Sequence, residues 1–200
     1  NLTLGPVQGY WSAMRTLSRA VIQAAQIVIG PAPVEISAAL GKDDLPLARR
    51  IHHAVLQAGL LISAAACIGL GFFGQPLFHF FSKGQYEFGY GLFFILLGVA
   101  FLNSAWNVSM SVAYAVNRHM TLTIGYLAAN GVAYLIGISL AKESGLEGLA
   151  LVLLAVDAFM VVIVLRKALG ILQETPGGLA KSLTKNPLSL LKRLKSESKA

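Results

Sequence analysis

Charged side chains are scarce in this chain of 200 residues. Asp, Glu, Lys and Arg make up 12% of it, about half of the share that is usual in soluble domains. Hydrophobic residues make up 56%, and the mean hydropathy is +0.67. A water-soluble globule of this size cannot bury so much apolar surface. The excess is expected to face lipid, which argues against a soluble enzyme or a nucleic-acid-binding domain.

Cysteine is almost absent as well. Cys67 is the single cysteine, so the sequence excludes a disulfide framework and a cysteine-based zinc site. His52 and His53 are adjacent, and on a helix their side chains would point about 100° apart, too far to ligate one metal together. No nucleophile stands in a recognisable relation to a base. We therefore expect no catalytic residues, no metal and no cofactor, and a protein that is not an enzyme.

Long apolar stretches dominate the chain. About 20 helical residues cross a hydrocarbon core of ~30 Å, and four stretches meet this length clearly. A fifth, the first in the chain, is long enough but carries Arg15 and Arg19. None of them alternates in polarity as the strands of a membrane barrel do. The sequence predicts an all-α, polytopic bundle over residues 1–173 with five transmembrane helices, at about 10–30, 54–74, 88–116, 121–141 and 146–165.

The basic residues between these stretches indicate the orientation of the bundle. The loops on one side carry most of the Lys and Arg, whereas those on the other carry only Lys83 and Lys142. The richer side is expected to be cytoplasmic. Residues 174–200 are predicted to form a basic cytoplasmic tail, either an amphipathic helix on anionic lipid or a solvated segment. The cytoplasmic basic residues before this tail would be Lys42, Arg49, Arg50, Arg118, Arg166 and Lys167.

Polar residues of the first span recur at helical spacing. Steps of three or four residues keep them within about 80° of one face. Two arginines one turn apart, backed by amides, suit an anionic ligand, because guanidinium keeps its charge and can grip phosphate or carboxylate with two hydrogen bonds. One interpretation is a water-filled cavity; the other is a helix lying flat among lipid headgroups. The residues on this face are Ser12, Arg15, Arg19, Gln23 and Gln26.

Two later spans repeat this pattern with neutral side chains. Amides, hydroxyls and aromatic rings together are suited to sugar recognition. Ordinary hydrogen bonds between helices, worth about 0.6 kcal/mol each, would explain the same residues. We favour a shared polar lumen because three stripes occur together. The third span contributes Asn103, Asn107, Ser111 and Tyr114 with Trp106 beside them, and the fourth contributes Thr123, Tyr126, Asn130 and Tyr134.

Two further features concern single helices. Asp157 is the only acidic residue deep within the last span, so it is expected either to pair with Arg15 or Arg19 or to take part in proton coupling. The second span repeats a small residue every four positions, which favours close packing against a neighbouring helix. These small residues are Gly59, Ser63, Cys67 and Gly71.

Several short motifs resemble a known transporter family. Residues 5–10 (GPVQGY), followed by the two arginines, resemble the opening of the eighth helix of bacterial polysaccharide biosynthesis proteins. These proteins are oligosaccharide-lipid flippases of the multidrug/oligosaccharidyl-lipid/polysaccharide exporter superfamily. Residues 33–37 (PVEIS) with 41–43 (GKD) are similar to a cytoplasmic connection of that family. Residues 117–119 (NRH) and 145–150 (GLEGLA) are similar to later signatures.

The resemblance implies about twelve helices in two lobes around a cavity that opens to each leaflet in turn. This chain, which begins with Asn1, would then supply helices eight to twelve of a longer protein whose N-terminal lobe is its partner. The implied cargo is an undecaprenyl-pyrophosphate-linked glycan, flipped across the bacterial inner (plasma) membrane. Membrane lipids would be further partners, and no nucleic acid is expected. The cavity residues would be Arg15, Arg19, Gln23, Asn103, Asn107, Tyr126 and Asn130, with Asp157 as an ion-pair or coupling group.

Two other functions remain open at this point. A multidrug or cation antiporter of the same superfamily would need an acidic and aromatic site, which the two arginines disfavour. A membrane scaffold without cargo would turn its polar stripes toward neighbouring helices and enclose no water.

Overall fold

The computed structural model describes residues 4–183, and side chains from residue 6 onward. Every regular element in this range is a helix, which confirms the all-α prediction. Four helical segments are long and apolar enough to cross a membrane: Pro6–Gly41, Leu45–Ser82, Tyr90–Ala115 and Met120–Ile171. This composition fits a multi-pass membrane protein. The helices are α1 (Leu4–Ile29), α2 (Ala32–Gly41), α3 (Leu45–Ser82), α4 (Tyr90–Ala115), α5 (Met120–Ile171) and α6 (Pro176–Leu183).

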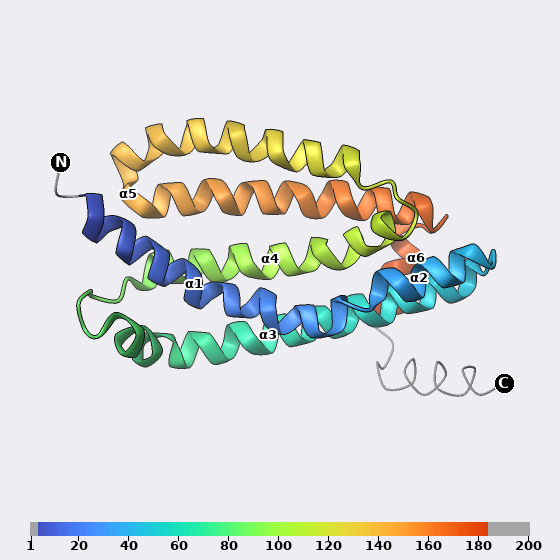
Figure 1. Cartoon of the computed structure of the whole chain (residues 1–200), viewed down its shortest axis with the longest axis horizontal. Helices are drawn as coiled ribbons and strands as arrows, with labels where there is room; N and C mark the ends of the chain where they lie inside the picture. The colour runs from blue at the N-terminus through green and yellow to red at the C-terminus, as the bar shows by residue number, and fades with distance from the viewer. Residues whose placement is uncertain (1–3, 184–200) are drawn as a thin grey trace.

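The longest helix, α5, is folded back on itself. Gly145 interrupts it with φ 63° and ψ −149°, and the two arms, 120–144 and 146–171, run side by side in opposite directions (Figure 1). The arms pack closely: a Cβ atom on Gly137 of the first arm would lie 2.6 Å from Leu149 of the second. A single non-helical residue therefore separates the two arms.

The third helix extends beyond the apolar stretch at both ends. The charged segment 41–50, which lies between the first two predicted spans, is mostly helical, because Asp44 caps α3 by accepting a hydrogen bond from the Leu47 backbone N–H at 2.9 Å. At the other end α3 continues through Pro76 and ends at Ser82. A proline removes one backbone hydrogen bond, and in α3 this loss does not terminate the helix.

The small residues of α3 face α4, as the sequence indicated. Gly59 lies against Val108, where an added Cβ would be 3.0 Å from the valine side chain. The Cys67 thiol is 3.8 Å from the carbonyl oxygen of Leu97. Close packing of these two helices thus depends on residues with little or no side chain.

Helix α4 has α1, α2, α3 and α5 as its neighbours, and the two ends of the bundle differ (Figure 1). The connections 42–44, 116–119 and 172–175 lie at one end with α2 and α6, and the connection 83–89 and Gly145 lie at the other. Lys42 and Arg118 of the basic loops therefore lie at one end, whereas Lys83 lies at the opposite end.

Only part of the expected basic tail lies within the described residues. Helix α6 packs against α3 and buries Leu179 in a core cluster with Ala48 and Leu172. Residues 184–200, which carry most of the tail's charge, lie outside the described residues.

Candidate binding pocket

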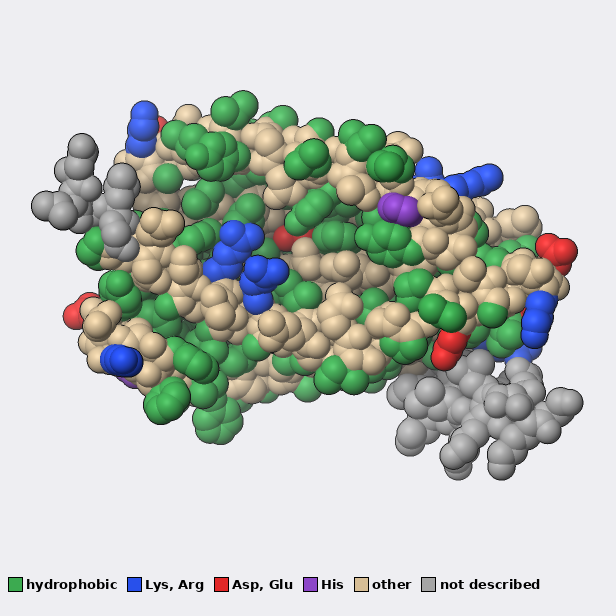
Figure 2. Space-filling model, in the orientation of Figure 1, with side chains coloured by type: hydrophobic (Ala, Val, Ile, Leu, Met, Phe, Trp, Pro, Cys, Tyr) green, Lys and Arg blue, Asp and Glu red, His purple; other side chains and the backbone are tan. Residues whose placement is uncertain are grey.

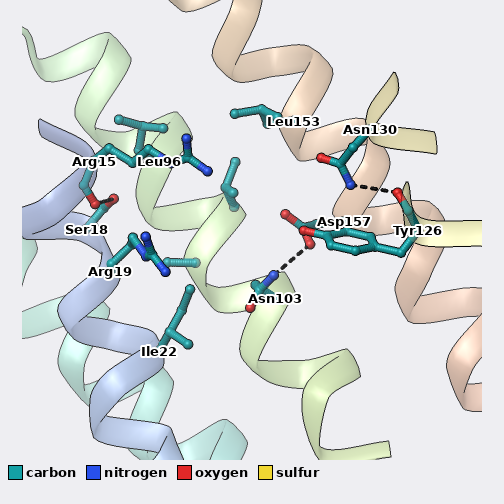
Figure 3. A pocket seen from close by; sticks show the side chains of 12 residues that line it. Arg15, Ser18, Arg19, Ile22, Leu96, Asn103, Tyr126, Asn130, Leu153 and Asp157 are labelled. Atoms are coloured by element: carbon teal, nitrogen blue, oxygen red, sulfur yellow. Dashed lines mark hydrogen bonds between the residues drawn. The ribbon is translucent and has the colours of Figure 1, made fainter. Parts of the chain in front are cut away.

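A polar pocket lies between α1, α4 and both arms of α5. Its volume is about 160 Å³. Figure 3 shows that its side chains converge from helices far apart in the sequence. The polar lining residues are Arg15, Ser18, Arg19, Asn103, Tyr126, Asn130 and Asp157, and the apolar ones are Ile22, Leu96, Val99, Ala100 and Leu153.

Arg15 and Arg19 form the α1 wall of this pocket. They occupy successive turns near the middle of α1, so both point to the same side of the helix. Figure 2 shows the basic side chains of α1 midway along one face, beside a recess that contains an acidic side chain. Within the described part of the chain, neither guanidinium makes a hydrogen bond or an ion pair. Both side chains are exposed in the isolated chain, so the pocket presents two cations that have no hydrogen-bonded or ion-paired partner among the described residues.

Asp157 lies on the opposite wall and is held by α4. Its Oδ1 atom accepts hydrogen bonds from Trp106 Nε1 at 2.7 Å and from Asn103 Nδ2 at 3.1 Å. The carboxylate is directed into the pocket (Figure 3). The expected ion pair with Arg15 or Arg19 is absent from the described residues, since the α4 donors hold the carboxylate instead.

The first arm of α5 supplies an aromatic ring and an amide. The Tyr126 ring packs against Trp106 with 5.2 Å between ring centroids and 51° between planes. Asn130 donates a hydrogen bond to the Tyr126 backbone carbonyl at 2.8 Å, which leaves its carbonyl group toward the pocket (Figure 3). This wall of the pocket therefore combines the apolar face of the Tyr126 ring with the polar amide of Asn130.

Two of the residues expected in the cavity do not line it. Gln23 is exposed on α1, one turn beyond Arg19. Asn107 lies one turn beyond Asn103 and donates both to the Asn103 backbone carbonyl at 2.9 Å and to its Oδ1 atom at 2.8 Å. Asn107 thus fixes the Asn103 amide that faces Asp157.

Trp106 lies beside the polar stripe of α4 and contacts a carboxylate of the pocket. It stands three positions after Asn103, on nearly the same side of α4, and its donor reaches Asp157. The spacing from Asn103 was a usable signal. The sequence alone could not show that Asp157 lies opposite Trp106.

The chemistry of the pocket favours an anion. Two guanidinium groups offer up to ten N–H donors with no acceptor among them. Among the described residues, no three His, Cys, Asp or Glu side chains are grouped so that they could hold a metal ion.

Comparison with known proteins adds no identification. No protein-family profile, curated protein or solved structure matches the chain significantly.

Proposed function

We propose that the chain is part of a membrane transporter that flips a lipid-linked oligosaccharide across the bacterial inner membrane by alternating access. The observation that carries this proposal is the pair of arginines, without a hydrogen bond or ion pair among the described residues, in a polar pocket that opens on one face of an apolar bundle. Placing Arg15 and Arg19 in lipid would cost several kcal/mol each. A pocket that receives a phosphate or carboxylate gives these charges a partner.

The remaining walls suit a sugar headgroup. The amides of Asn103 and Asn130 supply donors and acceptors, and the Tyr126 ring supplies a flat apolar surface. Such a combination favours a ligand with both hydroxyl groups and an anionic group. A cationic drug would be repelled by the two arginines, so the antiporter function is the weaker proposal.

The arrangement in the membrane is part of the same proposal. We count each arm of α5 as one crossing, which gives five crossings with α1, α3 and α4. The end of the bundle with α2 and α6 is assigned to the cytoplasm, because the basic loops gather there. The open side of the pocket would be completed by the N-terminal lobe that the family resemblance implies.

The experiment removes the two cations in the complete protein. Arg15→Gln/Arg19→Gln should reduce surface polysaccharide at least about tenfold in a strain that depends on this protein, because each lost charge weakens the attraction for an anion. The matched control is Arg118→Gln/Arg166→Gln, which removes two exposed arginines outside the pocket. Membrane levels of all variants are measured by immunoblot. Unchanged export in the pocket variant at equal protein level would contradict the proposal.

A further inference from the structure

Opposite charges that share a pocket inside a membrane protein are expected to pair. The attraction between two unit charges increases as the dielectric constant falls, and charged side chains within membrane segments usually form pairs with one another. Arg15, Arg19 and Asp157 line one pocket, yet no ion pair joins them. A specific feature of this pocket must therefore keep the carboxylate apart from the guanidinium groups.

The indole of Trp106 is that feature. Its N–H group is a donor without acceptor capacity, so it can bind the carboxylate but cannot bind an arginine. It donates to Asp157 Oδ1 at 2.7 Å, and the Trp106 side chain is only 8% exposed. Its ring packs against Tyr126 and belongs to the core cluster that also contains Met110 and Met160. The donor is thus held in place before any ligand arrives.

Asn103 donates a second, longer hydrogen bond to the Asp157 carboxylate. Its Nδ2 atom donates to the same oxygen at 3.1 Å, and its own Oδ1 atom accepts from Asn107 at 2.8 Å. Both donors come from α4, so the carboxylate is drawn toward α4 and away from α1. The second carboxylate oxygen, Oδ2, stays directed into the pocket (Figure 3).

We infer that Trp106 is a positioning residue of the anion site: by holding Asp157 against α4, it keeps the carboxylate from neutralising Arg15 and Arg19. This inference rests on the proposed function, in which the two arginines receive an anionic group. Without the indole donor, an arginine reaches across the small pocket and pairs with Asp157. The internal pair then occupies the place of the ligand's phosphate.

Binding of inorganic pyrophosphate to the intact protein in nanodiscs tests the inference. Trp106→Phe keeps an aromatic ring but removes the donor, and it should weaken pyrophosphate binding about tenfold. Asp157→Asn removes the competing charge and should bind pyrophosphate at least as tightly as the wild type. The double variant Trp106→Phe/Asp157→Asn should bind within about twofold of Asp157→Asn alone, since no carboxylate remains to pair with the arginines.

The double variant separates positioning from simple damage to the fold. If Trp106→Phe only loosened the core, Asp157→Asn would not restore binding, and that result would overturn the inference. Should Trp106→Phe not fold, 3-benzothienylalanine at position 106 keeps the shape of the indole while sulfur replaces the N–H. Wild-type affinity in that protein would also overturn the inference.

The proposed function fails on a different result. If Arg15→Gln/Arg19→Gln binds pyrophosphate as well as the wild type, the pocket is not an anion site, whatever the Trp106 variants do. If that variant loses binding while Trp106→Phe retains it, the anion site stands and only the role of Trp106 is rejected.

Discussion

Arg49 on α3 holds the carboxyl end of α5 at Leu172. Its Nε atom donates to the Leu172 carbonyl oxygen at 2.7 Å, and its Nη2 atom donates to the Gln173 carbonyl oxygen at 2.8 Å. The last carbonyl groups of a helix have no partner within the helix. The Arg49 guanidinium binds the carbonyl of Leu172, the C-cap residue of α5, together with that of the next residue, Gln173, so it joins the end of α5 to α3.

Loss of this connection should destabilise the bundle. Arg49→Met keeps an unbranched side chain but removes both donors, and we expect the free energy of unfolding to fall by about 2 kcal/mol. Chemical denaturation in micelles, followed by circular dichroism, measures the change. Arg166→Met is the control, because Arg166 is exposed and makes no hydrogen bond among the described residues. Equal destabilisation by both variants would contradict a specific role for Arg49.

The turn within α5 should depend on Gly145. Its φ of 63° and ψ of −149° lie in a region that is essentially restricted to glycine. Gly145→Ala is therefore expected to lower the free energy of unfolding by about 1–3 kcal/mol. Gly125→Ala serves as the control, since Gly125 lies in the same helix with no atom near an added Cβ. A Gly145→Ala protein as stable as the control would mean that the two arms do not need this backbone conformation.

The packing of α3 on α4 gives a further prediction. A Cβ atom on Gly74 would lie 2.5 Å from Cε1 of Phe93, a ring that is only 1% exposed and cannot move aside. Gly74→Ala should cost about 1–3 kcal/mol of stability through overpacking. Gly69→Ala meets nothing within 4 Å and should be neutral or stabilising by up to about 1 kcal/mol, because alanine favours the helix. The unfolding midpoint of Gly74→Ala should therefore fall, whereas that of Gly69→Ala should stay the same or rise.

The sequence was sufficient for the helical bundle and for the sides of the helices that face the pocket. Apolar length predicts membrane helices, and a spacing of three or four residues identifies one face, which is why Arg15, Arg19, Asn103 and Asn130 line the same pocket. Periodicity gives a direction around the helix axis but not the extent of a pocket along it. Gln23 shares the face of the arginines and nevertheless lies beyond the pocket.

Features that depend on two elements at once were not predictable in the same way. The second span was predicted to begin at about residue 54, whereas the Asp44 cap allows α3 to begin at Leu45. The partner of Asp157 was expected to be an arginine, because opposite charges attract in an apolar medium. Which donor lies within hydrogen-bonding distance of the carboxylate depends on the rotation of α5 about its axis. In the structure that donor is the Trp106 indole N–H.

Access of water to the pocket is the prediction that distinguishes a transporter from a scaffold. In a Cys67→Ala background, a single cysteine introduced by Asn130→Cys should react with a membrane-impermeant maleimide, because Asn130 lines the pocket and the reactive thiolate forms only in contact with water. Arg15→Cys, Arg19→Cys and Asn103→Cys should react as well.

The matched control for this labelling is Leu127→Cys. Leu127 lies on the same arm of α5 and is 73% exposed in the isolated chain, but it is not among the residues that line the pocket. In a membrane its side chain would face lipid, so we expect its labelling to be at least about tenfold slower, since apolar surroundings suppress the thiolate. Uniform protection at positions 15, 19, 103 and 130 would favour a scaffold whose polar stripes are buried against neighbouring helices. Fast labelling at position 127 would show that the open face of the bundle is itself wet, in which case accessibility of the pocket residues would not by itself require an enclosed passage.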